Sequence, residues 1–294
     1  GVQTCALPIS DIKDVHKIMD EVGIRVPVIA KIEKPQAVAN LEEIVNAFDG
    51  IMVARGDLGV EMPMEDVPIV QKRCIALARD KAKPVIVATQ MLDSMMSNSR
   101  PTRAEATDCS TAVLDGADAL MLSGETSVGD FPVEAVKAMA SIIERTEELM
   151  LDQIAQLKNA PTTKSGAITK AAAEIGKIMD AKFLVAFTSS GESARRMSEM
   201  RSAIPIVALT PEIGTYNRLS LTWGVDPIIA PTVSTTDEMV KQVDSVLIKD
   251  GRVKKGEFIM IVAGSPPGMP GGTNATRVHR IGDAVDGIAP AYQK

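Results

Sequence analysis

A repeating strand–helix pattern with a period of roughly 30 residues occupies positions 11–150 of this 294-residue chain and limits the folds open to it. After a first helix near 12–19, strands are expected at 26–30, 51–54, 85–88 and 119–122, with helices at 35–48, 67–81 and 103–114 between them. Continuous apolar strands that alternate with helices indicate a parallel sheet covered on both faces. The sequence therefore predicts an α/β fold for this part of the chain.

A second and smaller unit follows. A long helix from Pro132 to about Leu151 closes the first unit, and the stretch 159–163 is typical of a linker. Further helices are predicted at 167–179 and 238–248, and further strands at 183–187, 204–209 and 258–262. Ser234, with Asp237 three residues later, is predicted to be the N-cap of the 238–248 helix. We predict a doubly wound α/β domain here.

Polar residues follow each of the first four predicted strands. They are Lys31 and Glu33, then Arg55, Gly56 and Asp57, then Thr89 and Gln90, and finally Ser123, Gly124 and Glu125. In (β/α) barrels the loops at the carboxyl ends of the strands converge and carry the catalytic groups. Four consecutive strands that end in this way predict a functional site at that edge.

The residue types at these positions suggest phosphoryl-transfer chemistry. Glu33 and Asp57 are carboxylates on neighbouring strands, and Mg²⁺ is usually held by one or two carboxylates. Lys31 points to the same side of its strand as Glu33, where an ammonium can stabilise charge on a phosphoryl group or an enolate oxygen. Thr89 offers a hydroxyl for proton relay through water. The backbone N–H groups around Gly56 can bind a substrate carboxylate, because glycine permits close approach.

Each feature has a simpler interpretation when taken singly. The pair Lys31 and Glu33 can be a local salt bridge, the Arg-Gly-Asp segment 55–57 only a turn, and Ser-Gly-Glu-Thr at 123–126 a helix cap. Their occurrence together at successive strand ends favours a metal-dependent barrel enzyme that acts on an anionic substrate. The pattern by itself selects no reaction.

Charge and cysteine content narrow the class of partner. A net charge of −6 and a pI near 5.2 argue against nucleic acid, which requires a basic face. A phosphorylated metabolite bound through a metal ion remains compatible with an acidic protein. Cys5, Cys74 and Cys109 lack metal-ligand spacing, so reduced thiols in a cytoplasmic protein are expected. No apolar run reaches the roughly 18 residues of a membrane span, so no membrane partner is expected.

Several long segments resemble the pyruvate kinase family, bacterial type. They are 28–38 (VIAKIEKPQAV), 51–61 (IMVARGDLGVE), 87–92 (VATQML), 100–105 (RPTRAE) and 121–126 (MLSGET), in the order of the family. The resemblance is close over residues 10–150 and looser beyond. It implies that 10–157 form the last four units of a (β/α)₈ TIM barrel and 158–294 a regulatory and oligomerisation domain. It also implies transfer of phosphate from phosphoenolpyruvate to ADP in glycolysis, giving pyruvate and ATP, by a homotetramer.

The resemblance assigns roles to matching residues. Lys31 would stabilise the transferring phosphoryl group and the enolate, and Glu33 and Asp57 would be ligands of Mg²⁺ or Mn²⁺. Gly56, Asp57 and Thr89 would bind the pyruvate end, with Thr89 near the proton-transfer path. The family also uses K⁺, whose ligands would lie in barrel strands that precede this segment.

The loop from Thr188 to Ser193 resembles an effector site. In regulated relatives the corresponding loop holds a sugar phosphate, so the candidate effector-binding residues are Thr188, Ser189, Ser190, Gly191 and Ser193. The segment 271–274 resembles a second part of that pocket. Glu192 would repel a phosphate, and an ordinary polar turn is the alternative interpretation.

The amino terminus raises a separate hypothesis. Residues 1–9 match nothing in the family pattern, so we expect a non-native leader joined to a truncated gene. Half a barrel would leave an open strand edge, and we expect low solubility or association through it.

Two other functions stay open. One is a different metal-dependent barrel enzyme for pyruvate or phosphoenolpyruvate, and the other is a non-catalytic module that binds effector or associates with other subunits.

Overall fold

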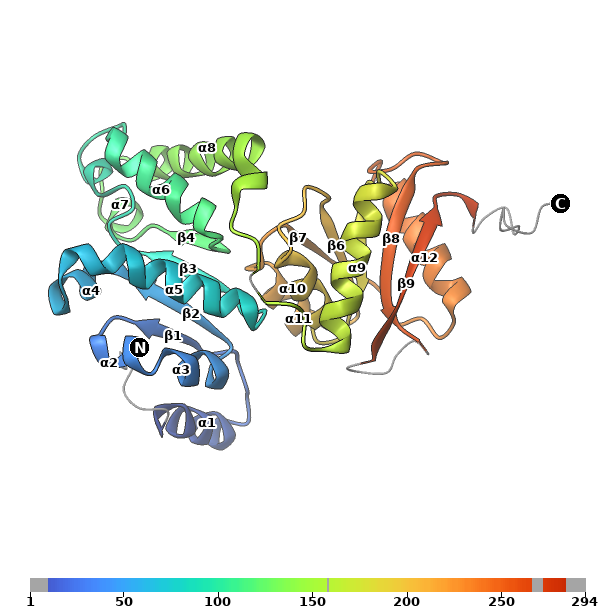
Figure 1. Cartoon of the computed structure of the whole chain (residues 1–294), viewed down its shortest axis with the longest axis horizontal. Coiled ribbons are helices and arrows are strands. Elements are labelled where there is room, and N and C mark those ends of the chain that lie inside the picture. The colour runs from blue at the N-terminus through green and yellow to red at the C-terminus, as the bar shows by residue number, and fades with distance from the viewer. Residues whose placement is uncertain (1–9, 158, 266–271, 284–294) are drawn as a thin grey trace. The chain divides into compact units, whose positions relative to one another are not determined.

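The computed structural model describes residues 10–157, 159–265 and 272–283, which form two compact units (Figure 1). The first unit comprises Gly1–Leu157 and the second Lys158–Lys294. The expected leader at 1–9 and Gly271 of the expected effector pocket lie outside the described residues. Within the described residues, no helix is both long and apolar enough to cross a membrane.

The first unit is built on a four-stranded parallel sheet. Its strands are β1 (Ile29–Ile32), β2 (Gly50–Ala54), β3 (Val85–Ala88) and β4 (Ala119–Met121), in the order β1-β2-β3-β4. Ile32 pairs with Val53, and Ala54 with Ala88, so the carboxyl ends of the first three strands meet at one edge. The predicted α/β fold with a parallel sheet is confirmed. In the described part of the chain the sheet is open, with β1 and β4 at its edges.

Helices connect these strands. They are α1 (Ser10–Val22), α2 (Pro35–Ala39), α3 (Leu41–Ala47), α4 (Arg55–Glu61), η1 (Met64–Asp66), α5 (Val67–Asp80), η2 (Asp93–Met96), α6 (Arg103–Asp115), α7 (Gly124–Ser127), α8 (Pro132–Met150) and η3 (Leu151–Gln153). Proline occupies the first turn of α2, α5 and α8, where its missing N–H costs no helical hydrogen bond.

Two predictions for this unit, and one of the simpler interpretations, were wrong in detail. The helix expected at 35–48 breaks at Asn40, whose side-chain amide donates to the Gln36 carbonyl and competes with the helical pattern. The first strand begins at Ile29 instead of Val26, because Pro27 has no N–H and the Val28 N–H donates to the Asp49 carboxylate. The Arg-Gly-Asp segment is the first turn of α4.

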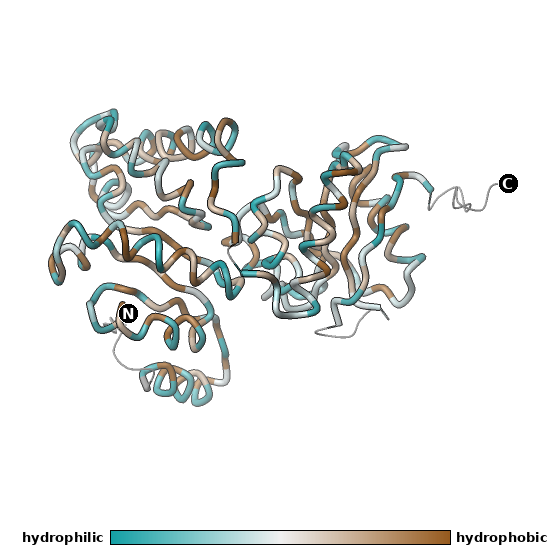
Figure 2. The backbone as a smooth tube through the Cα atoms, viewed as in Figure 1, coloured by the Kyte–Doolittle hydropathy of each residue, from teal (hydrophilic) through white to brown (hydrophobic). Residues whose placement is uncertain are grey.

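The core of the first unit lies between the sheet and its helices. Figure 2 shows the apolar stretches along the strands and along the helices beside them. The fully buried side chains include Ile32, Ile51, Val53, Val85 and Val87 of the strands, Leu41 and Val45 of α3, and Cys74, Ile75 and Ala78 of α5. Burial of each large aliphatic side chain contributes about 1.5–3 kcal/mol, so this packing holds the strand ends in place.

The second unit has a five-stranded sheet in the order β7-β6-β5-β8-β9. The strands are β5 (Leu184–Phe187), β6 (Ile206–Thr210), β7 (Val225–Ile229), β8 (Phe258–Gly264) and β9 (Thr273–Arg280), of which only β9 is antiparallel to its neighbour. Its helices are α9 (Lys164–Ile178), α10 (Glu192–Ser198), α11 (Ile213–Leu219) and α12 (Thr236–Lys249). Two buried clusters, one including α12 and the other α9 and α10, cover the sheet and confirm the doubly wound architecture.

Sequence reasoning missed α11, β7 and β9, and it misplaced one helix cap. Thr235, rather than Ser234, is the N-cap of α12 and forms a capping box with Glu238. Ser234 takes part only through its N–H, which donates to the Glu238 carboxylate at 2.7 Å. The strand expected from Ile204 begins at Ile206, because Pro205 has no N–H for the ladder.

Glu105 links α6 to η2 in the first unit. Its carboxylate accepts from the N–H of Thr102, completing a capping box, and from the N–H and hydroxyl of Ser94, both at 2.6 Å. Burial acts to raise the pKa of Glu105, but the hydrogen bonds from Ser94 and Thr102 outweigh it and lower this pKa below its ordinary value of 4.5.

We predict that Glu105→Gln destabilises the protein by about 1 kcal/mol at pH 7, because an amide accepts fewer of these hydrogen bonds. A lowered folded pKa stabilises the folded state above the ordinary pKa, and this contribution is lost as the pH falls through the folded value. The difference between variant and wild type should therefore shrink below pH 4.5. Urea unfolding at several pH values measures this difference in the free energy of unfolding. Glu148→Gln, which removes an exposed ion pair with Arg145, is the control. A difference that is independent of pH would contradict the prediction.

The two described cysteines should be inert in the folded chain. Cys74 and Cys109 are free and buried, and burial raises the pKa of each thiol to about 12. In a Cys5→Ser variant, iodoacetamide at pH 8 should modify neither thiol until urea unfolds the protein. Mass spectrometry of the alkylated protein measures this, and rapid labelling of the native variant would contradict it.

Candidate functional site

Lys31, Glu33 and Asp57 come together at the carboxyl edge of the first sheet. Lys31 lies within β1 rather than after it, Glu33 follows β1 directly, and Asp57 lies in the first turn of α4 after β2. The Lys31 ammonium is 2.5 Å from the Glu33 carboxylate and 3.6 Å from that of Asp57. The hydrogen bond to Glu33 and the charges of both carboxylates raise the pKa of Lys31, although partial burial opposes this. Lys31 and Glu33 do form the salt bridge of the simpler interpretation, and Asp57 is a second carboxylate partner of Lys31.

The two carboxylates fit a divalent cation. A single cationic group, the Lys31 ammonium, already lies within reach of both. The Glu33 side chain is 7% exposed and that of Asp57 55%, so one carboxylate is enclosed by the protein and the other faces solvent. In the part of the chain that is described, no group of three or more His, Cys, Asp or Glu residues could hold a metal ion, and this site offers two carboxylates. Two carboxylates, with substrate or water oxygens completing the shell, is an arrangement that suits Mg²⁺ or Mn²⁺.

Thr89 lies against Gly56 on the adjacent strand end. The Gly56 N–H donates to the Thr89 hydroxyl oxygen at 2.7 Å, and that hydroxyl donates to the Ala88 carbonyl at 2.7 Å. A Cβ atom at position 56 would lie 3.2 Å from the Thr89 hydroxyl, a tight contact that would push Thr89 away by a few tenths of an ångström and that glycine avoids. The Gly56 amide, expected to bind a substrate carboxylate, has Thr89 as its partner in this structure, and that role stays a prediction.

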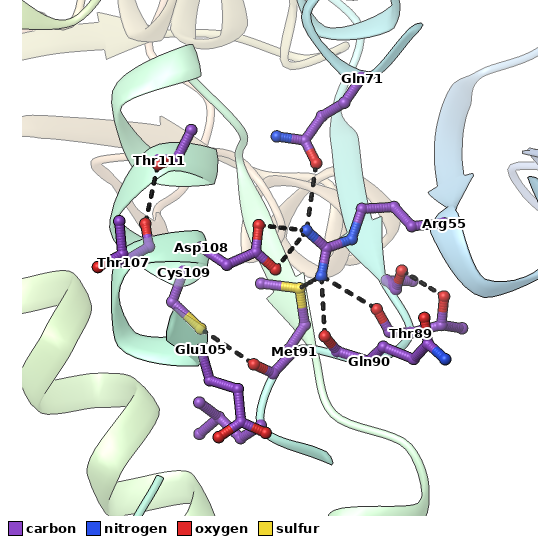
Figure 3. Close-up of polar contacts among 12 residues, drawn as sticks. Arg55, Gln71, Thr89, Gln90, Met91, Glu105, Thr107, Asp108, Cys109 and Thr111 are labelled. Carbon is purple, nitrogen blue, oxygen red and sulfur yellow. Dashed lines mark hydrogen bonds and ion pairs between the residues drawn. The ribbon is translucent and has the colours of Figure 1, made fainter. Parts of the chain in front are cut away.

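Arg55 is the functional candidate that sequence reasoning missed (Figure 3). It was noted among the polar strand-end residues, but no role was given to it. Its guanidinium lies between the Asp108 carboxylate on α6 and the carbonyl oxygens of Thr89 and Gln90. Asp108 is 53 residues further along the chain, so a single sequence holds no signal of this pairing.

Glu125 joins the loops that follow β3 and β4. Its carboxylate is 3% exposed and accepts from the N–H of Leu92 at 3.1 Å and from that of Ser123 at 2.7 Å. Ser123 occupies the N-cap position of α7, as the helix-cap interpretation expects. Its side chain, however, makes no capping hydrogen bond.

The second unit contains a pocket at the carboxyl edge of its sheet. The strand order reverses between β5 and β8, and such switch points are where open α/β sheets bind ligands. The pocket has a volume of about 80 Å³ and is lined in part by Thr188, Ser189, Ser190, Glu192, Ser193, Gln242, Gly272 and Thr273. The Thr188 hydroxyl accepts from the Gly191 N–H, and the Ser193 and Thr273 hydroxyls are 2.6 Å apart. Of the candidate effector residues, Gly191 does not line the pocket but is the N-cap of α10, with φ of 83°.

Glu192 is the one charged residue among the described residues that line this pocket. Its carboxylate forms an ion pair with Arg196 one turn along α10, at 2.9 Å, which offsets part of its charge. The pocket therefore offers hydroxyl and backbone groups to a ligand rather than a concentration of positive charge.

Each of the two units matches a known protein family. The family "Pyruvate kinase, barrel domain" matches residues 7–136, and "Pyruvate kinase, alpha/beta domain" matches residues 166–279. The pyruvate kinase of Mycobacterium tuberculosis is 56% identical over 274 residues, which are 93% of this chain and 58% of that protein. The corresponding enzyme of Corynebacterium glutamicum is 54% identical over 93% of this chain and 57% of its own length.

A solved structure agrees as well. A crystal structure of a pyruvate kinase from Cryptosporidium parvum has a TM-score of 0.84 and 32% identity, covering 94% of this chain and 57% of its own. The chain thus spans less than two thirds of the length of these relatives. Because both domain families match in succession, and the relatives are similar throughout the matched region, the chain belongs to the pyruvate kinase family.

Proposed function

We propose that this chain carries part of a site that transfers phosphate from phosphoenolpyruvate to ADP, giving pyruvate and ATP. The observation that supports it best is the Lys31 ammonium held between the carboxylates of Glu33 and Asp57 at adjacent strand ends. Such a group is placed to meet negative charge that develops on a phosphoryl group and on an enolate oxygen.

The proposed roles follow from position and chemistry. Glu33 and Asp57 would hold Mg²⁺ or Mn²⁺, which supplies positive charge to the phosphate oxygens when bound. Lys31 would then turn from the carboxylates toward the substrate, and its ammonium would face the negative charge of the phosphoryl group. Gly56, Asp57 and Thr89 would position the pyruvate end of the substrate, and the Thr89 hydroxyl would hold a proton near the enolate carbon.

The remaining features of the proposal rest on the family relation and on composition. We propose a K⁺ requirement and a homotetramer, as in the family. The exposed side chains of Val60, Met64 and Ile69 around η1 are compatible with self-association. We also propose a cytoplasmic location, with which the free thiols of Cys74 and Cys109 are compatible.

The assay is pyruvate formation from phosphoenolpyruvate and ADP by the purified chain with Mg²⁺ and K⁺. Turnover that requires ADP and a divalent cation would support the proposal. A parallel sample is a fusion in which the amino-terminal part of a relative, which this chain does not span, precedes the chain. A folded chain without turnover in both samples would overturn it.

A second candidate function is effector binding by the second unit, supported by its pocket. We propose that Thr188, Ser189, Ser190 and Ser193 bind a small hydroxyl-rich metabolite that carries little negative charge, with Gly191 shaping the turn. Calorimetric titration with neutral sugars and with sugar phosphates tests this. Binding of a sugar phosphate in preference to the neutral sugars would contradict the charge argument, and binding without any turnover would favour a non-catalytic module.

We predict that Lys31→Met lowers turnover by about 100- to 1,000-fold, because one preorganised electrostatic stabiliser is lost. Divalent-cation binding should persist, since both carboxylates remain. Lys182→Met is the matched control, because Lys182 forms an exposed ion pair with Asp180 in the other unit. Turnover of the Lys31 variant at the wild-type level would refute the role given to Lys31.

We predict that Asp57→Asn weakens Mn²⁺ binding by at least about tenfold, because a charged ligand of a hard cation becomes neutral. Electron paramagnetic resonance of free Mn²⁺ measures the affinity without requiring activity. Asp180→Asn, at an exposed aspartate, serves as the control and should bind Mn²⁺ as the wild type does. Equal affinity in the Asp57 variant and wild type would remove Asp57 from the site.

A further inference from the structure

Thr89 and Gln90 have an unusual backbone conformation at the candidate site. Their φ angles are 68° and 53°, and among the described residues no other two consecutive non-glycine residues both have positive φ. A left-handed conformation is unfavourable for a β-branched residue such as threonine, so neighbouring groups must enforce it. The conformation matters because it carries the Thr89 hydroxyl to the Gly56 N–H, at 2.7 Å.

The Arg55 guanidinium supplies the contacts that enforce this conformation. Its Nη2 donates to the carbonyl oxygens of Thr89 at 3.1 Å and of Gln90 at 3.0 Å, and it lies 2.9 Å from the Met91 sulfur (Figure 3). One nitrogen thus holds two successive carbonyl groups on the same side. Loss of this nitrogen would release both peptides at once.

The other side of the guanidinium is anchored by a different part of the chain. Its Nη1 is 2.7 Å and 2.6 Å from the two carboxylate oxygens of Asp108 on α6, and 3.5 Å from the Gln71 side-chain oxygen on α5. Gln71 is held in turn by Asp115, at 2.9 Å. A planar fork that donates in two directions requires arginine, since lysine offers only a point charge.

The contacts form a closed ring through the site. Arg55 directly precedes Gly56 and Asp57, its side chain binds the Thr89 carbonyl, and the Thr89 hydroxyl binds the Gly56 amide. A shift of the guanidinium therefore moves Thr89 relative to the strand end that bears Asp57. The Arg55 side chain is 11% exposed, so water cannot readily replace it.

We propose that Arg55, anchored by Asp108, is a positioning residue for the phosphoryl-transfer site. It holds the peptides of Thr89 and Gln90 in the left-handed conformation and so fixes the Thr89 hydroxyl beside Gly56. The importance of Arg55 for turnover rests on the proposed function. The positioning itself is measurable without any turnover.

The first experiment measures amide hydrogen exchange at Gly56 by NMR of the whole chain. In Arg55→Gln the protection of this amide should fall at least about tenfold, because its acceptor is released. Asp108→Asn should have a smaller effect in the same direction, and its side chain is 38% exposed, so the change is compatible with folding. Lys72→Met, which removes a neighbouring ion pair with Asp115, is the control and should leave Gly56 protected. Unchanged protection in both Arg55→Gln and Asp108→Asn would overturn the proposal.

Two further variants separate positioning from general stability. Gln90→Gly in the Arg55→Gln background should restore part of the Gly56 protection, because glycine adopts positive φ without strain. A loss that arose only from general destabilisation would not be restored, and that result would count against the proposal. Arg55→Lys should fall between wild type and Arg55→Gln, and full protection in this variant would show that charge alone suffices and overturn the role of the fork.

Kinetics then connect positioning to turnover. Arg55→Gln should lower kcat by more than it changes KM for phosphoenolpyruvate, and its effect should be non-additive with Thr89→Val, since both act through one hydroxyl. Additive effects would overturn the positioning role. A wild-type chain without turnover would instead defeat the proposed function, while the exchange results at Gly56 would still decide whether Arg55 positions Thr89.

Discussion

The in-register pairing of parallel strands in the first sheet is the constraint on which the candidate site depends. Ile32 lies opposite Val53, and Ala54 opposite Ala88, so β1, β2 and β3 end at nearly the same level. A one-residue slip would turn every side chain to the other face of the sheet. The close packing of the buried strand side chains against the helices opposes that slip, and this packing thereby fixes the separation of Lys31, Glu33 and Asp57, which come from two strand ends.

The charged side chains at this edge interact in positions that the packing has set. Glu33 is nearly buried beside an ammonium, whereas Asp57 is open to solvent. A charge buried without a partner would be costly, and Lys31 supplies the partner within the site itself. The second unit has a different strand order and a different kind of site. Its pocket lies at a switch point and is rich in hydroxyl groups, with much less charge at hand.

Much of this organisation could be predicted from sequence. The strands β2 and β3, the helices α5, α6 and α8, and the gathering of polar residues at strand ends all follow from apolar runs, prolines and periodicity. The failures have local or long-range causes. Asn40 breaks a helix through its own side chain, and Pro27 delays a strand so that Lys31 falls inside it. β9 was missed because an edge strand of mixed polarity such as Thr273–Arg280 lacks the continuous apolar signal of a buried strand.

The site was predicted in its residues but not in its internal contacts. Lys31, Glu33 and Asp57 could be named because their types and positions relative to strands carry information. The Arg55–Asp108 pair could not, because its members are far apart in the chain and each has a simpler interpretation alone. The left-handed backbone at Thr89 and Gln90 was equally invisible, since neither residue type favours it.

The close contact between Gly56 and Thr89 has a consequence for how this sequence can change over time. A methyl group at position 56 would come within 3.2 Å of the Thr89 oxygen and 3.5 Å of its Cβ. The two positions are 33 residues apart, yet they are coupled, because a side chain at 56 would require Thr89 to move by a few tenths of an ångström. The cost of a substitution at 56 therefore depends on the residue at 89, and a smaller residue there would lower it.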